Sequence, residues 1–153
     1  MQACVPSQKN DQPLQSMKDI FDLLGRILLS FIFLFEGYDY IVYAKQQKEA
    51  MLRYGLTWNQ DLLLYGAIGL LVLGGLMLLT GYRMRTGAIM LMLYWVPMTY
   101  VVHSFWDVAP ENRRLESIFF MKNIAITGGL LIAATHTSGR YAIRRLFATT
   151  RVH

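Results

Sequence analysis

The chain has 153 residues, is 54% hydrophobic and carries a formal net charge of +5 at pH 7. This length gives one domain, and four predicted spans of about 20 residues leave only about half of the chain for termini and loops. A soluble catalytic domain does not fit into that remainder. Because the chain is so apolar, we attribute its net positive charge to the Lys and Arg residues that membrane proteins carry on their cytoplasmic side. No nucleic-acid partner is predicted. Cys4 is the single cysteine, which excludes an internal disulfide and dithiol exchange by this chain alone.

The first segment, residues 1–19, is predicted to be a polar cytoplasmic tail. Because it has no apolar core, we expect it to be neither a signal peptide nor an anchor. Residues 20–44 follow as the first predicted membrane span, interrupted by Arg26, Glu36 and Asp39. Because charge inside a membrane is costly, these interruptions are where function is to be sought. Arg26 lies near the predicted cytoplasmic end, where its long side chain would reach lipid headgroups.

Residues 61–80 and 86–103 are predicted to be the second and third spans. Each contains an uncharged run close to the roughly 20 residues that cross the hydrocarbon core. The short turn at residues 81–85 predicts an antiparallel hairpin, with Gly81 as the left-handed residue that ends the second span. Pro97 predicts a kink late in the third span.

Residues 117–136 are the fourth predicted span, and residues 137–153 are a basic cytoplasmic tail. The arginines of this tail alternate with apolar residues, which suits a short interfacial helix on anionic lipid, with a disordered tail as the alternative. The sequence thus predicts an all-α polytopic membrane protein with a four-helix transmembrane bundle over residues 20–136. The arginines expected to contact lipid headgroups are Arg26, Arg83, Arg85, Arg144 and Arg145.

The distribution of Lys and Arg between the loops predicts the orientation. Eight lie in the N-terminal tail, the 81–85 turn and the C-terminal tail, against five in the two other loops. Since cytoplasmic segments are richer in Lys and Arg, both termini are predicted to be cytoplasmic. The protein is therefore expected in the bacterial plasma (inner) membrane as a multi-pass protein.

Small residues recur at helical spacing in the second and fourth predicted spans. Such a stripe lets a neighbouring helix approach closely, so it is predicted to pack helices and not to bind a ligand. The stripes are Ala67, Gly74 and Gly81, seven apart, and Ala125, Gly129 and Ala133, four apart.

The predicted topology brings several polar residues to one depth in the outer third of the bilayer. Glu36 and Lys122 lie at similar depths below the outer ends of their helices, so the two are expected to form an ion pair inside the bundle. Two interpretations stay open: a structural network that fixes helix order, or a site for a small molecule, a quinone headgroup or a proton. The members of this outer-leaflet network are Glu36, Asp39, His103, Lys122 and Asn123.

The sequence contains no motif for a bound cofactor. His103 and His136 lie on opposite sides of the predicted bundle, so they do not ligate one haem or one copper ion. No nucleotide loop, metal cluster or nucleophile triad is recognisable, so no catalytic residue and no metal site is predicted. The chain alone is therefore expected to bind no cofactor, with a quinone left open as a ligand.

Several short motifs resemble the DoxX family of small four-span bacterial membrane proteins. The clearest is FMKNIAITGGLL at residues 120–131, which is similar to the family's fourth-span signature. Supporting matches are Arg26, residues 35–37, residues 80–85 and residues 103–106. The similarity extends over most of the chain.

This resemblance implies a role in a membrane redox system, because relatives are associated with thiosulfate:quinone oxidoreductase and with complexes of thiol or oxidative stress. The chain is expected to be a non-catalytic accessory subunit that contacts membrane lipids and other membrane subunits. Any oxidoreductase activity would need those partners. The alternative is a binding or carrier bundle for a quinone or another small hydrophobic molecule.

We expect cysteines introduced at positions 50 and 112 of a Cys4→Ser chain to react with a membrane-impermeant thiol reagent from the periplasmic side. A cysteine at position 145 should react only after the cytoplasmic face is opened, because the Lys and Arg distribution places the C-terminus there. Labelling of position 145 in intact spheroplasts would contradict the predicted orientation.

Overall fold

The computed structural model describes residues 12–135, and every regular element in this range is an α-helix. The all-α fold class is thereby confirmed. The predicted C-terminal tail and residues 1–11 of the predicted N-terminal tail lie outside the described residues. The helices are α1 (Gln12–Val42), α2 (Ala44–Arg53), α3 (Gln60–Thr80), α4 (Met84–Val102) and α5 (Pro110–Thr135).

Two of these helices, α3 and α5, are long and apolar enough to cross a membrane. They correspond to the second and fourth predicted spans. The first and third predicted spans overlap α1 and α4 and end one or two residues beyond them. A four-span topology with both termini in the cytoplasm stays a prediction.

Two of the long helices begin earlier than the sequence predicted. α1 begins at Gln12, inside the segment expected to be a polar tail. α5 begins at Pro110, whose fixed φ suits the first helical turn, and Glu111 adds a negative charge that is favourable at a helix N-terminus. Hydropathy does not detect these ends because their residues are polar.

The segment after the first predicted span contains a helix that the sequence did not predict. α2 is polar, and Met51 is its buried residue. Lys48 of α2 forms an ion pair with Asp61 in the first turn of α3. The hydrogen bond to the Asp61 carboxylate raises the pKa of Lys48. This exposed contact ties α2 to the start of α3.

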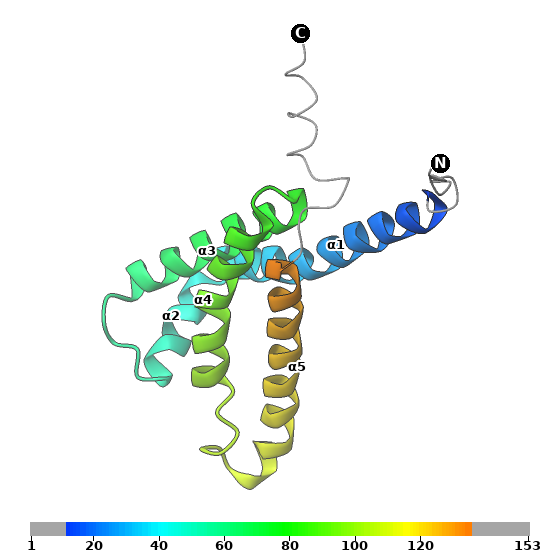
Figure 1. The fold of residues 1–153 in the computed structure, drawn as a ribbon. Coiled ribbons are helices and arrows are strands. Elements are labelled where there is room, and N and C mark those ends of the chain that lie inside the picture. Colours follow the sequence, from blue (N-terminus) through cyan, green and yellow to red (C-terminus); the bar gives the residue numbers. More distant parts are fainter. Residues whose placement is uncertain (1–11, 136–153) are drawn as a thin grey trace, which may run out of the picture.

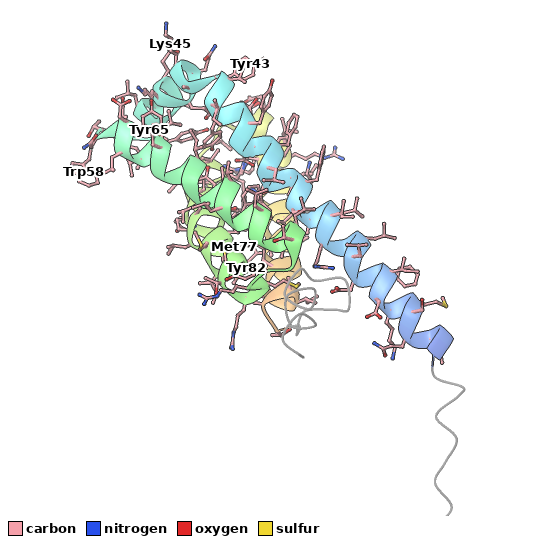
Figure 2. The ribbon with its side chains drawn as sticks, turned by 90° about the horizontal axis from the view of Figure 1, so that it is seen from above. Tyr43, Lys45, Trp58, Tyr65, Met77 and Tyr82 are labelled. Carbon is pink, nitrogen blue, oxygen red and sulfur yellow. The ribbon has the colours of Figure 1, made fainter. Side chains whose placement is uncertain are left out.

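The long helices pack in the spatial order α1, α3, α4 and α5. Figure 1 shows α1 beside α3, and α4 beside α5, with the two pairs running in clearly different directions. α1 and α5 meet only where the C-terminal end of α5 reaches the middle of α1. Beyond that point the N-terminal part of α1 extends past the other helices (Figure 2). The arrangement is therefore more open between α1 and α5 than the compact bundle that the sequence predicted.

Exposed aromatic side chains mark both ends of α3. Trp58 and Tyr65 lie at one end, and Tyr82 lies at the other (Figure 2). Trp and Tyr concentrate where a membrane meets water, so these positions agree with a helix that crosses the bilayer.

Two glycines bring the backbones of α3 and α4 into contact. A Cβ on Gly74 would lie 2.7 Å from Leu91 Cγ and 3.1 Å from the backbone oxygen of Gly87. A Cβ on Gly87 would lie 2.8 Å from Met77 Cβ and 3.0 Å from the backbone oxygen of Gly74. No side chain fits between the helices at this point, which is the geometry that small residues provide in membranes.

The opposite flank of α3 receives α1. A Cβ on Gly75 would lie 2.9 Å from Leu34 Cδ2, and a Cβ on Gly37 of α1 would lie 3.0 Å from Val72 Cγ2. α3 ends at Gly81, which has a positive φ of 69° and is the left-handed residue that the sequence predicted. Pro97 lies inside α4, which continues past it to Val102.

We expect Gly87→Ala to lower the free energy of unfolding in detergent by about 1–3 kcal/mol, because the added methyl group meets backbone as well as Met77. Gly69→Ala is the matched control, since a Cβ there has no neighbour within 4 Å. Unfolding by SDS titration measures both variants. Equal stabilities would show that the contact between α3 and α4 is looser than described.

Candidate functional site

A pocket of about 920 Å³ opens between the N-terminal half of α1 and the C-terminal half of α5. Met84, the first residue of α4, contributes a third wall. The volume lies within the range of small-molecule sites, about 300–1,000 Å³. The pocket occupies the gap that remains because α1 and α5 meet only near Leu29 and Gly129.

Arg26 is the charged residue most deeply buried in this pocket. Its side chain is only 3% exposed, and its Nε lies 3.2 Å from Asp22 Oδ2 one turn earlier in α1. Nη1 and Nη2 are fully buried, and neither donates a hydrogen bond to any described residue. The expected outward extension of this side chain to headgroups is therefore wrong, because the guanidinium points into a buried environment.

Other charged residues surround Arg26 on α1. Asp19, which is 6% exposed, and Lys18 line the pocket together with Asp22. Two carboxylates thus face one buried guanidinium and one exposed ammonium group. The formal charges cancel, so the polar end of the pocket offers both a cationic and an anionic partner.

The remaining walls of the pocket are apolar. α1 supplies Leu28, Leu29 and Ile32, which follow the charged residues along the helix. α5 supplies Ile126 and Ile132 from the opposite side. The pocket is therefore amphiphilic, with its charged end toward the N-terminus of α1 and its apolar end toward the helix centre.

A sevenfold stripe on α1 explains why these charged residues are buried. Asp19, Arg26, Phe33 and Tyr40 are seven apart, lie on one helix face and are all buried. The second half of the stripe packs against other helices, and the ring of Phe33 lies 5.0 Å from that of Trp95. The first half of the stripe, Asp19 and Arg26, lines the pocket. The sequence did not lead to a prediction of Asp19 or Asp22 in a site, although the spacing of Asp19 from Phe33 was a signal for Asp19, and Asp22 lies one turn before Arg26.

The structure separates the predicted outer-leaflet network into smaller groups. His103 Nδ1 lies 2.8 Å from Glu116 Oε2 in α5. Lys122 is exposed, with its Nζ 4.6 Å from the centre of the Phe119 ring. Asn123 is partly buried, and its backbone oxygen accepts a hydrogen bond from Thr127. Asp39 accepts a hydrogen bond of 3.3 Å from Gln47 in α2.

Glu36 interacts with tyrosines and not with Lys122. The Tyr94 hydroxyl donates a hydrogen bond of 2.5 Å to the Tyr40 hydroxyl, which is itself within hydrogen-bonding reach of the Glu36 carboxyl. Within residues 12–135, no ion pair joins Glu36 to Lys122, so the prediction of that pair is wrong. The pair does not form because α1 and α5 make little contact with each other, whereas the predicted compact bundle placed these two helices side by side.

The predicted packing residues also fall into separate environments. Ala67 and Gly74 are buried in α3, whereas Ala125 of α5 is exposed. Gly129 and Ala133 line the pocket, and a Cβ on Gly129 would make an ordinary contact of 3.5 Å with Leu29. The α5 stripe therefore faces a cavity along part of its length.

The predicted headgroup arginines other than Arg26 lie at or beyond the described helix ends. Arg83 has a positive φ of 48° and precedes α4, with its guanidinium carbon 6.0 Å from the centre of the Tyr82 ring. Arg85 is exposed. Arg144 and Arg145, like His136, lie outside the described residues. In the part of the chain that the structure describes, no group of three His, Cys, Asp or Glu residues could hold a metal ion.

We expect a double-mutant cycle of Glu36→Gln and Lys122→Met to give a coupling energy below about 0.5 kcal/mol, because the two side chains make no direct contact. The positive control is the cycle of Tyr40→Phe and Tyr94→Phe, whose shared hydrogen bond should give about 0.5–1.5 kcal/mol. Both cycles are measured by unfolding in detergent. A larger coupling for Glu36 and Lys122 than for the tyrosines would contradict the arrangement.

Comparisons with known proteins agree with the motifs. The DoxX family profile matches residues 21–104. The chain is 31% identical over 137 residues to the inner membrane protein YqjF of Escherichia coli (strain K12), an alignment that covers 87% of this chain and 96% of the relative. No solved structure matches the chain. The predicted location in a bacterial inner membrane is confirmed by this relative together with the apolar helices. Both the profile and the relative show that the chain belongs to the DoxX family.

Proposed function

We propose that this DoxX-family inner-membrane protein binds one amphiphilic molecule in the pocket between α1 and α5. In this proposal α1, α3, α4 and α5 cross the membrane, and both termini lie in the cytoplasm. The function corresponds to the alternative derived from the sequence, a binding or carrier bundle for a small hydrophobic molecule.

The observation that carries the proposal is a buried arginine at the charged end of an amphiphilic pocket. Nη1 and Nη2 of Arg26 make no hydrogen bond with any described residue. Buried charged donors without partners are costly, so a ligand that accepts hydrogen bonds there would stabilise the protein. Leu28, Leu29 and Ile32 beside it suit an apolar tail.

The position of the pocket suits a ligand that enters from the membrane. Its walls come from the first half of α1, the first residue of α4 and the second half of α5. Under the proposed topology these are the cytoplasmic ends of all three helices. The pocket would therefore open toward the inner leaflet, where membrane-dissolved amphiphiles have direct access to it.

A second candidate function is that of an accessory subunit in a redox-linked complex. The observation that favours it is the N-terminal part of α1, which extends beyond the other helices (Figure 2). Leu14 and Met17 of this part are exposed and lie outside the pocket lining. A partner helix packed on this segment would cover those side chains. In either function, the chain alone would bind no redox cofactor, and any oxidoreductase activity would need partner subunits.

We expect a lysophospholipid with a photoactivatable acyl chain to label the pocket residues near positions 28–32 and 126–133 of the purified protein. Gly129→Leu should reduce this labelling about tenfold, because the added carbons enter the space between Leu29 and α5. Gly128→Leu is the matched control, since a Cβ at that position meets no atom within 4 Å.

Competition with the photoactivatable lysophospholipid shows which kind of molecule occupies the pocket. Displacement of the label by a short-chain ubiquinone analogue would identify a quinone site. Labelling spread evenly over the membrane-facing sides of all helices, unchanged by Gly129→Leu, would overturn the binding function. Co-purification of a subunit that protects Met17 from labelling would then favour the accessory role.

A further inference from the structure

We infer that the α1–α5 pocket selects a lipid whose headgroup carries both a phosphate and a primary ammonium group. Arg26 binds the phosphate and Asp19 binds the ammonium. This inference rests on the proposed function, that the pocket holds an amphiphile, and it names the chemistry of the head.

The phosphate position follows from the donors that Arg26 leaves unused. Asp22 Oδ2 lies 3.2 Å from Nε of the guanidinium, and both residues line the pocket. Nη1 and Nη2 stay without hydrogen-bond partners among the described residues. Paired guanidinium donors match two phosphate oxygens, and this bidentate geometry is a common use of arginine.

The carboxylates argue against a headgroup that is only anionic. Asp19 is 6% exposed and forms no ion pair within residues 12–135. A phosphate without a cation would meet repulsion from Asp19 and Asp22 together, which Lys18 offsets weakly because it is exposed to solvent. A primary ammonium on the same headgroup removes this repulsion and donates up to three hydrogen bonds to the carboxylates.

The order of the groups along α1 matches the order of atoms in such a lipid. Apolar Leu29 and Ile32 come first, then Arg26, and then Asp19 toward the N-terminus. Arginine side chains lean toward the N-terminus of their helix, which places the guanidinium beside Asp22. Asp19 lies three residues farther on, about 4.5 Å along the axis. Acyl chain, phosphate and ammonium would thus follow one another in the same direction.

A quinone would interact favourably with fewer of the charged residues in the pocket. Its carbonyl oxygens would accept hydrogen bonds from Arg26, but a neutral ring offers no cation to the buried Asp19. Free phosphoethanolamine carries both charges but leaves Leu28, Leu29 and Ile32 without an apolar partner. A membrane lipid uses both ends of the pocket.

Native mass spectrometry of the full-length protein in detergent tests this selectivity. The probes are three phospholipids with identical acyl chains: phosphatidylethanolamine, phosphatidylglycerol and phosphatidylcholine. We expect the first to bind about tenfold more tightly than the other two, since only it offers a phosphate together with ammonium N–H donors. Free phosphoethanolamine should not displace it.

Two variants separate the roles of the charged residues. Arg26→Gln should weaken binding of all three lipids, because each loses its phosphate partner. Asp19→Asn should remove the preference for phosphatidylethanolamine over phosphatidylglycerol while leaving phosphatidylglycerol bound. Arg113→Gln is the control, because this exposed arginine lies outside the pocket and should not change any of the three affinities.

Each outcome has a distinct meaning. Equal binding of the three lipids, still blocked by Gly129→Leu, would overturn the headgroup inference and leave the proposed function in place. Absence of any bound lipid, with no labelling of the pocket by the photoactivatable lysophospholipid, would overturn both. If a charge variant does not fold, a phosphatidylethanolamine with a photoactivatable headgroup decides the question in the unmodified protein. It should label α1 near residues 15–22, and headgroup labelling confined to other surfaces would overturn the inference.

Discussion

The contact between Gly74 of α3 and Gly87 of α4 constrains the position of every other long helix. It brings two backbones together next to the tight turn at Gly81, so α4 leaves α3 in a fixed direction. Gly75, the neighbouring residue, holds α1 on another side of α3 through Leu34. Because α5 packs along α4, it follows the direction of α4 and reaches α1 only with its end (Figure 1). The pocket is the space left by this geometry.

Arg26 lies on the part of α1 that extends past its contact with the other helices, and other charged residues of α1 surround it there. Toward the centre of α1, the buried stripe presents Phe33 to the ring of Trp95. Toward the N-terminus, Asp22 supplies a charge beside Arg26, which offsets part of the cost of burying the guanidinium. The unused donors at Nη1 and Nη2 show that the protein's own residues do not complete this compensation. A ligand group that accepts hydrogen bonds would complete it.

Hydropathy and motifs predicted the all-α class, the family and the left-handed Gly81, because each of these depends on local sequence. The crossing of the two helix pairs was not predictable, since it depends on Gly87, whose role is visible only beside Gly74. The assumption of a compact bundle then produced the incorrect pair of Glu36 with Lys122. The same assumption led to the prediction that Arg26 contacts lipid headgroups. Arg26 lies seven residues before Phe33, and this spacing already placed it on the same buried helix face. Spacing along α1 carried more information about burial than the charge of the individual residues.

The two polar regions of α1 differ in whether the fold completes their hydrogen bonds. Tyr40 and Arg26 are 14 residues apart on one stripe, about 21 Å along the helix axis. Near the C-terminal end of α1, Tyr94 from α4 donates to Tyr40, which in turn reaches Glu36, so side chains from two helices satisfy one another. Near the N-terminal end of α1, the C-terminal part of α5 brings only apolar residues and Gly129 to the pocket. A satisfied network favours a structural role, and an unsatisfied one beside a cavity favours binding. The same face of one helix therefore holds the bundle together at one end and offers a ligand site at the other.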